Sequence, residues 1–174
     1  QLGQELVGKT KIQKKTKSMV FLTCELTCAN KIVATASGVW KILKLSGINI
    51  NTVPVLDILK RKTNKIIGSR SYSFKKETIK YLGRLCVNTY KKNKIGTIIK
   101  HLPGHGSAQS DSHKRLPLVK DSYNSLQKND FDCFHKVNSY FAMTAHILYK
   151  RLDTQNVSTH SKFIIQNIEN IHML

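Results

Sequence analysis

Apolar residues recur at three- and four-residue spacings in two long stretches of the chain. The first stretch, residues 27–46, has Gly47 directly after it as a C-terminal stop, and its apolar positions are Ile32, Val33, Ala36, Val39, Trp40, Leu43 and Leu45. The second, residues 76–93, places on one side Ile79, Leu82, Leu85, Cys86 and Tyr90. This spacing predicts helices over 27–46 and 76–93. Shorter helices are predicted over residues 122–129, 131–139 and 160–171.

Short β-type runs separate these stretches, at residues 48–58 and 96–99 and within 140–149. Strands that alternate with amphipathic helices form parallel sheets. We therefore expect an α/β fold of the partial (β/α)₈ barrel type. A complete barrel takes about 250 residues, so the 174 residues of this chain suffice for roughly half to two thirds of one.

Polar side chains stand at the carboxyl end of each predicted strand. These are Asp57, the pair Lys100 and His101, and His146. In a (β/α)₈ barrel the active site lies at that end of the strands, and open parallel sheets also bind ligands there. Three strands with polar ends favour one shared site.

The chain is expected to contain two regions. Residues 1–26 have no clear period and read as a loose basic arm, whereas residues 27–174 form the barrel domain. No apolar run approaches the roughly 18 to 20 residues of a membrane span. We therefore expect a cytoplasmic protein without a membrane span.

The formal net charge is +19, which could indicate a nucleic acid or another anionic polymer as partner. However, only five of the 29 basic residues are Arg, and Arg is the preferred residue for base and phosphate contacts. The lysines are spread along the chain, so a compositional bias explains the charge better. The basic residues at Lys60, Arg61, Lys62 and Lys65 are interpreted in the same way, as a solvated cluster.

Residues 100–113 carry the densest chemistry, since this stretch contains three imidazoles, one carboxylate and one ammonium. Its glycines predict an exposed loop that turns sharply and moves. Asp111 and His113 are two residues apart, so in an extended loop both side chains point the same way. A carboxylate bonded to one imidazole nitrogen fixes the tautomer, and the other nitrogen can then deliver a proton. A zinc site is the alternative, but the spacing matches no common zinc motif.

Several motifs in this order resemble the N-terminal barrel domain of glycoside hydrolase family 3, in its bacterial β-N-acetylhexosaminidase branch of peptidoglycan recycling. The matching stretches are residues 53–57 (VPVLD), 68–73 (GSRSYS), 100–106 (KHLPGHG) with 111–113 (DSH), and 143–146 (MTAH). The resemblance implies a retaining hydrolase that removes terminal β-linked N-acetylglucosamine without a metal or organic cofactor. It further implies that Arg70, Lys100 and His101 bind the sugar, that His113 is the general acid/base and that Asp111 orients it.

Two expected pieces of this family do not occur in the chain. The family's nucleophile is an aspartate on a later strand, and no residue near the end of the chain matches it; an early acidic sugar-binding motif is also missing. We therefore expect a truncated protein with little or no turnover of its own. Two other classes stay open, a non-catalytic sugar-binding remnant and a basic nucleic-acid-binding protein, the second supported only by charge.

Overall fold

The structure, a computed structural model, describes residues 6–17, 19–41, 43–61, 63, 65, 67–110 and 115–172. The chain divides into two compact units, residues 1–49 and residues 50–174. This division lies well beyond the boundary that the sequence suggests between residues 26 and 27. Each unit is described by itself.

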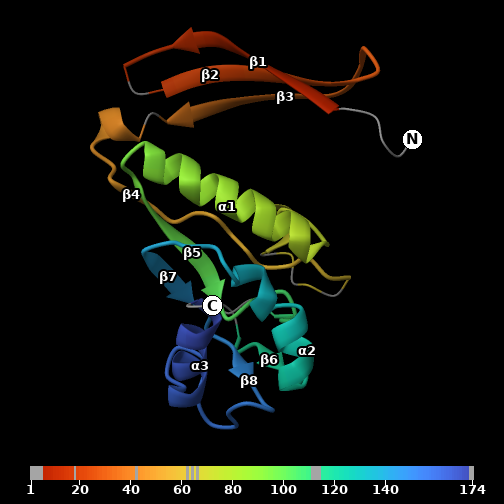
Figure 1. Cartoon of the computed structure of the whole chain (residues 1–174), viewed down its shortest axis with the longest axis vertical. Coiled ribbons are helices and arrows are strands. Elements are labelled where there is room, and N and C mark those ends of the chain that lie inside the picture. Colours follow the sequence, from red (N-terminus) through yellow and green to blue (C-terminus); the bar gives the residue numbers. More distant parts are fainter. Residues whose placement is uncertain are drawn as a thin grey trace. The chain divides into compact units, whose positions relative to one another are not determined.

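The first unit is a three-stranded antiparallel sheet with the order β1-β2-β3 (Figure 1). Its strands are β1 (Leu6–Lys15), β2 (Met19–Cys28) and β3 (Lys31–Lys41), and the 3₁₀ turn η1 (Lys44–Ser46) follows them. Ala29 and Asn30 form a two-residue hairpin between β2 and β3, with φ values of 47° and 61°. Such a turn matches the twist of paired strands.

The helix predicted over residues 27–46 is therefore wrong. Two features of the stretch favour a strand: it is rich in β-branched residues such as Ile32, Val33 and Thr35, and the Ala29-Asn30 turn returns it alongside β2. Once the stretch pairs with β2, successive residues point to opposite faces of the sheet. None of the described side chains of residues 7–49 is buried, so the described side chains of this sheet form no core.

The second unit is an α/β structure built on a parallel sheet, as the sequence predicts. The sheet has the order β4-β5-β7, with β4 (Ile50–Asn51), β5 (Gly96–Leu102) and β7 (Phe141–Thr144). A second parallel pair joins β6 (Leu118–Val119) to β8 (Leu148–Tyr149). Among the described residues these strands do not close into a barrel.

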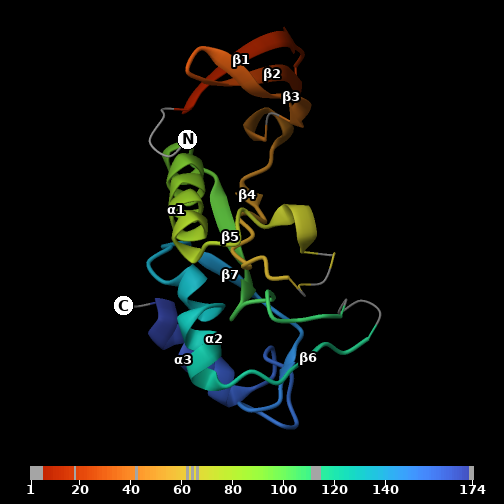
Figure 2. The ribbon, with the colours of Figure 1, turned by 90° about the vertical axis from the view of Figure 1, so that its right-hand side faces the viewer.

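The helices of the second unit lie at the predicted places. They are α1 (Lys76–Lys92), α2 (Tyr123–Lys128) and α3 (Lys162–His172). Residues 131–139 form only the short 3₁₀ helix η3 (Phe131–Phe134), and a further 3₁₀ helix, η2, covers Gly68–Arg70. Figure 2 shows α1 running alongside β5, whereas α2 and α3 gather around the β6–β8 pair in Figure 1.

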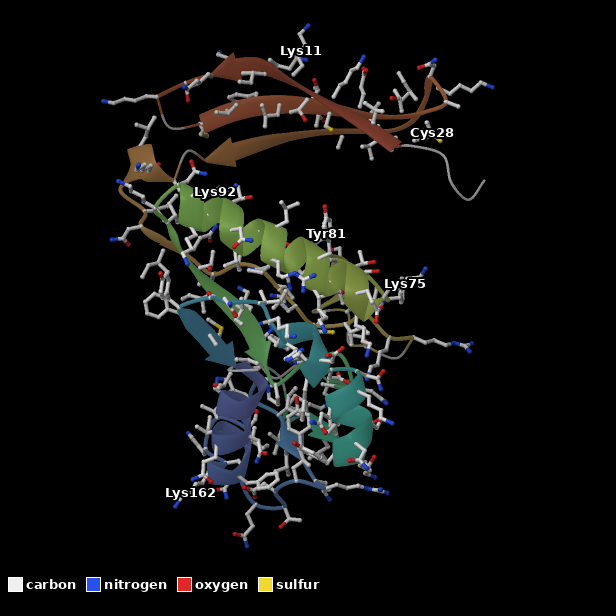
Figure 3. All side chains as sticks on the ribbon, viewed as in Figure 1. Lys11, Cys28, Lys75, Tyr81, Lys92 and Lys162 are labelled. Atoms are coloured by element: carbon white, nitrogen blue, oxygen red, sulfur yellow. The ribbon has the colours of Figure 1, made fainter. Side chains whose placement is uncertain are left out.

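The buried face of α1 matches the predicted one in part, because Ile79 is buried and Leu82, Cys86 and Tyr90 are half-buried. Ile79, Gly83 and Val87 point inward, whereas Leu85 is 53% exposed. Gly83 is part of the contact because the helix lies so close to the core that a Cβ there would come within 2.6 Å of the Leu56 side chain. Tyr81 lies on the outer side of the helix (Figure 3).

Two apolar clusters support the second unit. The first joins α1 to β5 and η3 and contains Leu56, Ile58, Ile79, Val87, Ile99, Leu102, Cys133, Phe134 and Val137. The second lies around β6 and β8 and contains Ala108, Val119, Leu126, Phe131, Ala145, Ile147, Tyr149 and Ile164. Residues 102–108 run between the two clusters, since Leu102 belongs to one and Ala108 to the other. In the described part of the chain, no helix has the length and the apolar composition needed to cross a membrane.

Candidate functional site

The carboxyl end of β5 carries Lys100 and His101, as the sequence predicts. The adjoining segment 54–57 pairs with β5 through a parallel bridge between Val55 and Lys100, and the Leu56 amide donates to the Lys100 carbonyl at 2.8 Å. This pairing brings Asp57, 44 residues earlier in the chain, against His101.

Asp57 is completely buried and organises the site. Its Oδ2 lies 2.7 Å from Nδ1 of His101, and its Oδ1 accepts from the backbone amides of His101 at 3.3 Å and of His105 at 2.6 Å. A carboxylate on Nδ1 fixes the orientation of the imidazole and leaves Nε2 for another partner. The prediction placed Asp57 at a strand end, and the structure gives it this bonding role.

Arg70 lies at the end of η2. The next residue, Ser71, connects this segment to Asp57, because its hydroxyl donates to the Asp57 carbonyl at 2.7 Å. The Arg70 guanidinium is close enough to act on Lys100 electrostatically: burial lowers the pKa of the Lys100 ammonium, Arg70 lowers it further, and Asp57 opposes both. The fold therefore places His101 against one buried carboxylate, with Lys100 next to it in β5 and Arg70 on a segment bonded to the same aspartate.

His105 is the least exposed of the described loop histidines, at 4%. Its ring lies edge-on to His101 with a centroid distance of 5.8 Å, and its Nδ1 is buried with no hydrogen-bond partner. Burial lowers the pKa of this imidazole, while Asp57 opposes that shift. A neutral His105 suits this setting, because a charged imidazole is difficult to desolvate.

This burial predicts that acid destabilises the fold through His105. Since its folded-state pKa lies below its unfolded value of 6.5, the unfolded chain binds the proton first, and the free energy of unfolding falls as the pH drops below about 6.5. The slope is at most about 1.4 kcal/mol per pH unit for one proton. Urea unfolding between pH 5 and pH 7.5 measures it, and His105→Gln should flatten the curve. The prediction fails if both proteins lose stability equally.

The loop is not the exposed, swinging segment that the sequence suggests, at least in its first half. Residues 102–106 and Ala108 are buried, and the Tyr149 hydroxyl, itself fully buried, donates to the Gly104 carbonyl. The expectation failed because the glycines here allow close packing: a Cβ at Gly106 would lie 2.4 Å from the Ile58 carbonyl oxygen.

A second buried carboxylate, Asp130, holds the far side of the loop. Its Oδ1 accepts from the Ser107 amide at 2.9 Å, and its Oδ2 lies 2.5 Å from the Lys60 ammonium and 3.0 Å from the Ser107 hydroxyl. Burial raises the pKa of Asp130, and Lys60 opposes the shift. Interpreting Lys60 as part of a solvated cluster was therefore wrong. No local pattern marks Asp130 or Lys60, because they lie 70 residues apart in the chain.

The remaining predicted residues are Asp111, His113 and His146. Asp111 and His113 fall outside the described residues. His146 is exposed, and its Nδ1 lies 2.8 Å from the Thr159 hydroxyl. No group of three or more His, Cys, Asp or Glu among the described residues has a geometry that could hold a metal ion.

Comparison with known proteins places these motifs in context. Residues 24–169 match the model of the glycosyl hydrolase family 3 N terminal domain. "Beta-hexosaminidase A" of Pseudoalteromonas piscicida is 32% identical over 126 residues, covering 70% of this chain and 21% of that protein. Curated relatives of this kind are much longer, and the chain spans between 21% and 37% of their length.

Solved structures give the same result. A glycoside hydrolase family 3 β-N-acetylglucosaminidase from Paenibacillus superposes with a TM-score of 0.69 at 30% identity, covering 73% of this chain and 26% of that one. NagZ from Neisseria gonorrhoeae, solved in complex with N-trifluoroacetyl-D-glucosamine, gives a TM-score of 0.65 at 29% identity, with 73% and 38% covered.

Proposed function

Since the chain belongs to the glycosyl hydrolase family 3 N-terminal domain family, we propose that its second unit is part of a (β/α)₈ barrel that binds a terminal β-linked N-acetylglucosamine of a peptidoglycan fragment. Arg70, Lys100 and His101 hold the sugar. The observation that carries this proposal is that Lys100 and His101 lie at the carboxyl end of β5 beside the buried Asp57, while Arg70 stands on a segment that is hydrogen-bonded to Asp57 through Ser71.

The chemistry of these groups suits a sugar. Lys100 and Arg70 offer charged donors, and such hydrogen bonds are stronger than neutral ones. His101, held at Nδ1 by Asp57, presents Nε2 as a second kind of contact. The NagZ of Neisseria gonorrhoeae binds an N-acylated glucosamine in its solved complex, and the same class of ligand fits a cluster of fixed donors.

We further propose that the reaction of the whole protein is hydrolysis of the glycosidic bond with retention. His113 would exchange a proton with the glycosidic oxygen as general acid/base, and Asp111 would orient His113 and stabilise its charged form. In retaining glycosidases a second carboxyl group ordinarily does this work, so an imidazole and carboxylate pair would be a variation on the same two-step chemistry. A non-catalytic sugar-binding protein is the second candidate, favoured by the hydrogen-bonding chemistry of Arg70, Lys100 and His101, which suits binding without requiring turnover.

Binding of N-acetylglucosamine, measured by calorimetry or NMR titration, tests the proposal. Lys100→Met should weaken binding by about tenfold or more, since a hydrogen bond to a charged group contributes about 1.5 to 3 kcal/mol. Lys162→Met removes an exposed lysine from the first turn of α3 (Figure 3) and is the matched control, with binding unchanged. Equal affinity of the two variants would contradict the proposed site.

Turnover of a chromogenic β-N-acetylglucosaminide, measured on the same samples, separates the two candidates. Hydrolysis that His113→Ala abolishes supports the enzyme. Saturable binding that Lys100→Met weakens, without turnover, supports the sugar-binding protein.

A further inference from the structure

A partly buried network of hydrogen bonds ties the loop after β5 to the segment that leads to Arg70. Lys60 lies at its centre, because its ammonium contacts both the Ser107 hydroxyl and the Asp130 carboxylate at 2.5 Å. The Asp130 side chain is fully buried, whereas that of Lys60 is 31% exposed. The network therefore joins a fully buried carboxylate to a partly exposed ammonium beside the loop.

A neighbouring pair of hydrogen bonds reinforces the connection. The Thr63 hydroxyl donates to the Gly106 carbonyl at 2.7 Å, and it accepts from the Lys60 amide at the same distance. Residues 60 and 63 thus contact two successive loop residues, Gly106 and Ser107. Arg70 follows seven residues after Thr63 on the same segment.

The site is consequently held from two sides. On one side Asp57 fixes His101 and the His105 amide, and Ser71 is bound to the Asp57 carbonyl. On the other side Lys60 and Asp130 fix Ser107. The groups proposed to bind the sugar come from two separate segments, and these contacts determine how far apart the segments lie.

We propose that Lys60 and Asp130 are positioning residues that hold the Arg70 segment and the loop after β5 in register. Neither residue touches the sugar. Without Lys60, the Asp130 carboxylate keeps its bonds to Ser107 but lacks its counter-charge, and a buried unpaired carboxylate attracts water or a proton. The loop then separates from residues 60–63, and the spacing between Arg70 and the Lys100–His101 pair depends only on the bonds of Asp57 to Ser71 and His101. This inference rests on the proposed function only for its effect on sugar binding.

The test compares Lys60→Met with Lys76→Met. Both substitutions remove a lysine that pairs with an aspartate of the 130–132 segment, but Lys76 pairs with Asp132 at 3.0 Å and does not touch the loop in any described contact. Lys60→Arg restores the charge. The first readout is hydrogen exchange of the loop amides of residues 105–108, measured by NMR on the full chain. The second is affinity for N-acetylglucosamine.

Lys60→Met should speed loop exchange by roughly tenfold or more, the size expected when one charged hydrogen bond is lost. Amides of α3 should exchange at the parent rate, which shows that the unit has not simply unfolded. Lys76→Met should leave the loop rate unchanged, and Lys60→Arg should recover most of the protection. Affinity for the sugar should fall most in Lys60→Met, less in Lys60→Arg, and not at all in Lys76→Met. Equal loop exchange in the Lys60→Met and Lys76→Met proteins would overturn the inference.

The two readouts keep the proposals apart. If the parent protein does not bind N-acetylglucosamine, the proposed function fails, while loop exchange still decides the role of Lys60. If the parent binds and Lys60→Met loosens the loop without weakening binding, then the network does not set the spacing of the site and the inference fails.

Discussion

Gly106→Ala should lower the free energy of unfolding of the second unit by about 3 kcal/mol, at the upper end of the usual range for overpacking. A Cβ at this position would lie 2.4 Å from the Ile58 carbonyl oxygen, 2.7 Å from Ile58 Cγ2 and 3.0 Å from Asp130 Oδ1. The nearest of these atoms belongs to the backbone of a buried residue, so it cannot rotate away. The loop must move instead, and the contacts of Ser107 with Asp130 are strained with it.

Urea unfolding followed by circular dichroism measures this loss. Gly68→Ala is a suitable control in the same unit, because a Cβ there meets no atom within 4 Å and only the φ of +31° opposes the substitution. Its expected loss is about 1 kcal/mol. Similar losses in the two variants would contradict the prediction, because they would show that the loop accommodates the added methyl group at Gly106 without a steric penalty.

Asp57→Ala should have a comparable or larger effect, about 4 kcal/mol, and it should also abolish sugar binding. Asp57 is completely buried and accepts from two backbone amides besides contacting the His101 ring. Each buried donor that loses its acceptor destabilises the fold by about 1 to 3 kcal/mol. The His101 ring also loses the partner that fixes its orientation, so binding fails even in the fraction that stays folded.

Two further variants test whether the buried hydrogen bonds of Asp57 cause the loss of stability. Asp57→Asn keeps the size and one acceptor oxygen, so it should lose about half as much stability as Asp57→Ala, roughly 2 kcal/mol. Asp121→Ala removes an exposed carboxylate and should change stability by no more than about 0.5 kcal/mol. Urea unfolding and an N-acetylglucosamine titration check both expectations. If Asp57→Ala bound the sugar like the parent, Asp57 would have no part in arranging the site.

The local spacing of apolar residues predicted an element correctly wherever that spacing alone is enough to specify it. Helices α1 and α3 lie at the predicted places because apolar residues recur in them at helical spacing, and strand β5 contains the short apolar run predicted at 96–99. The same rule failed for residues 27–46, where three- and four-residue spacings coexist with β-branched residues. Pairing with β2 decided the outcome there, and pairing with a distant strand leaves no mark on local spacing.

The amino-acid sequence by itself determined the chemical content of this protein: an α/β order of elements, a motif-rich stretch after β5, and the residues Arg70, Lys100 and His101 at a strand end or in a matching motif. Only the tertiary structure decided which charges are buried and what they hold. Asp57 bonds to a loop 44 to 48 residues away, and Asp130 pairs with Lys60 across 70 residues. Burial and pairing of charges depend on which segments pack together. A chain read residue by residue therefore cannot tell a solvated lysine from one that anchors a site.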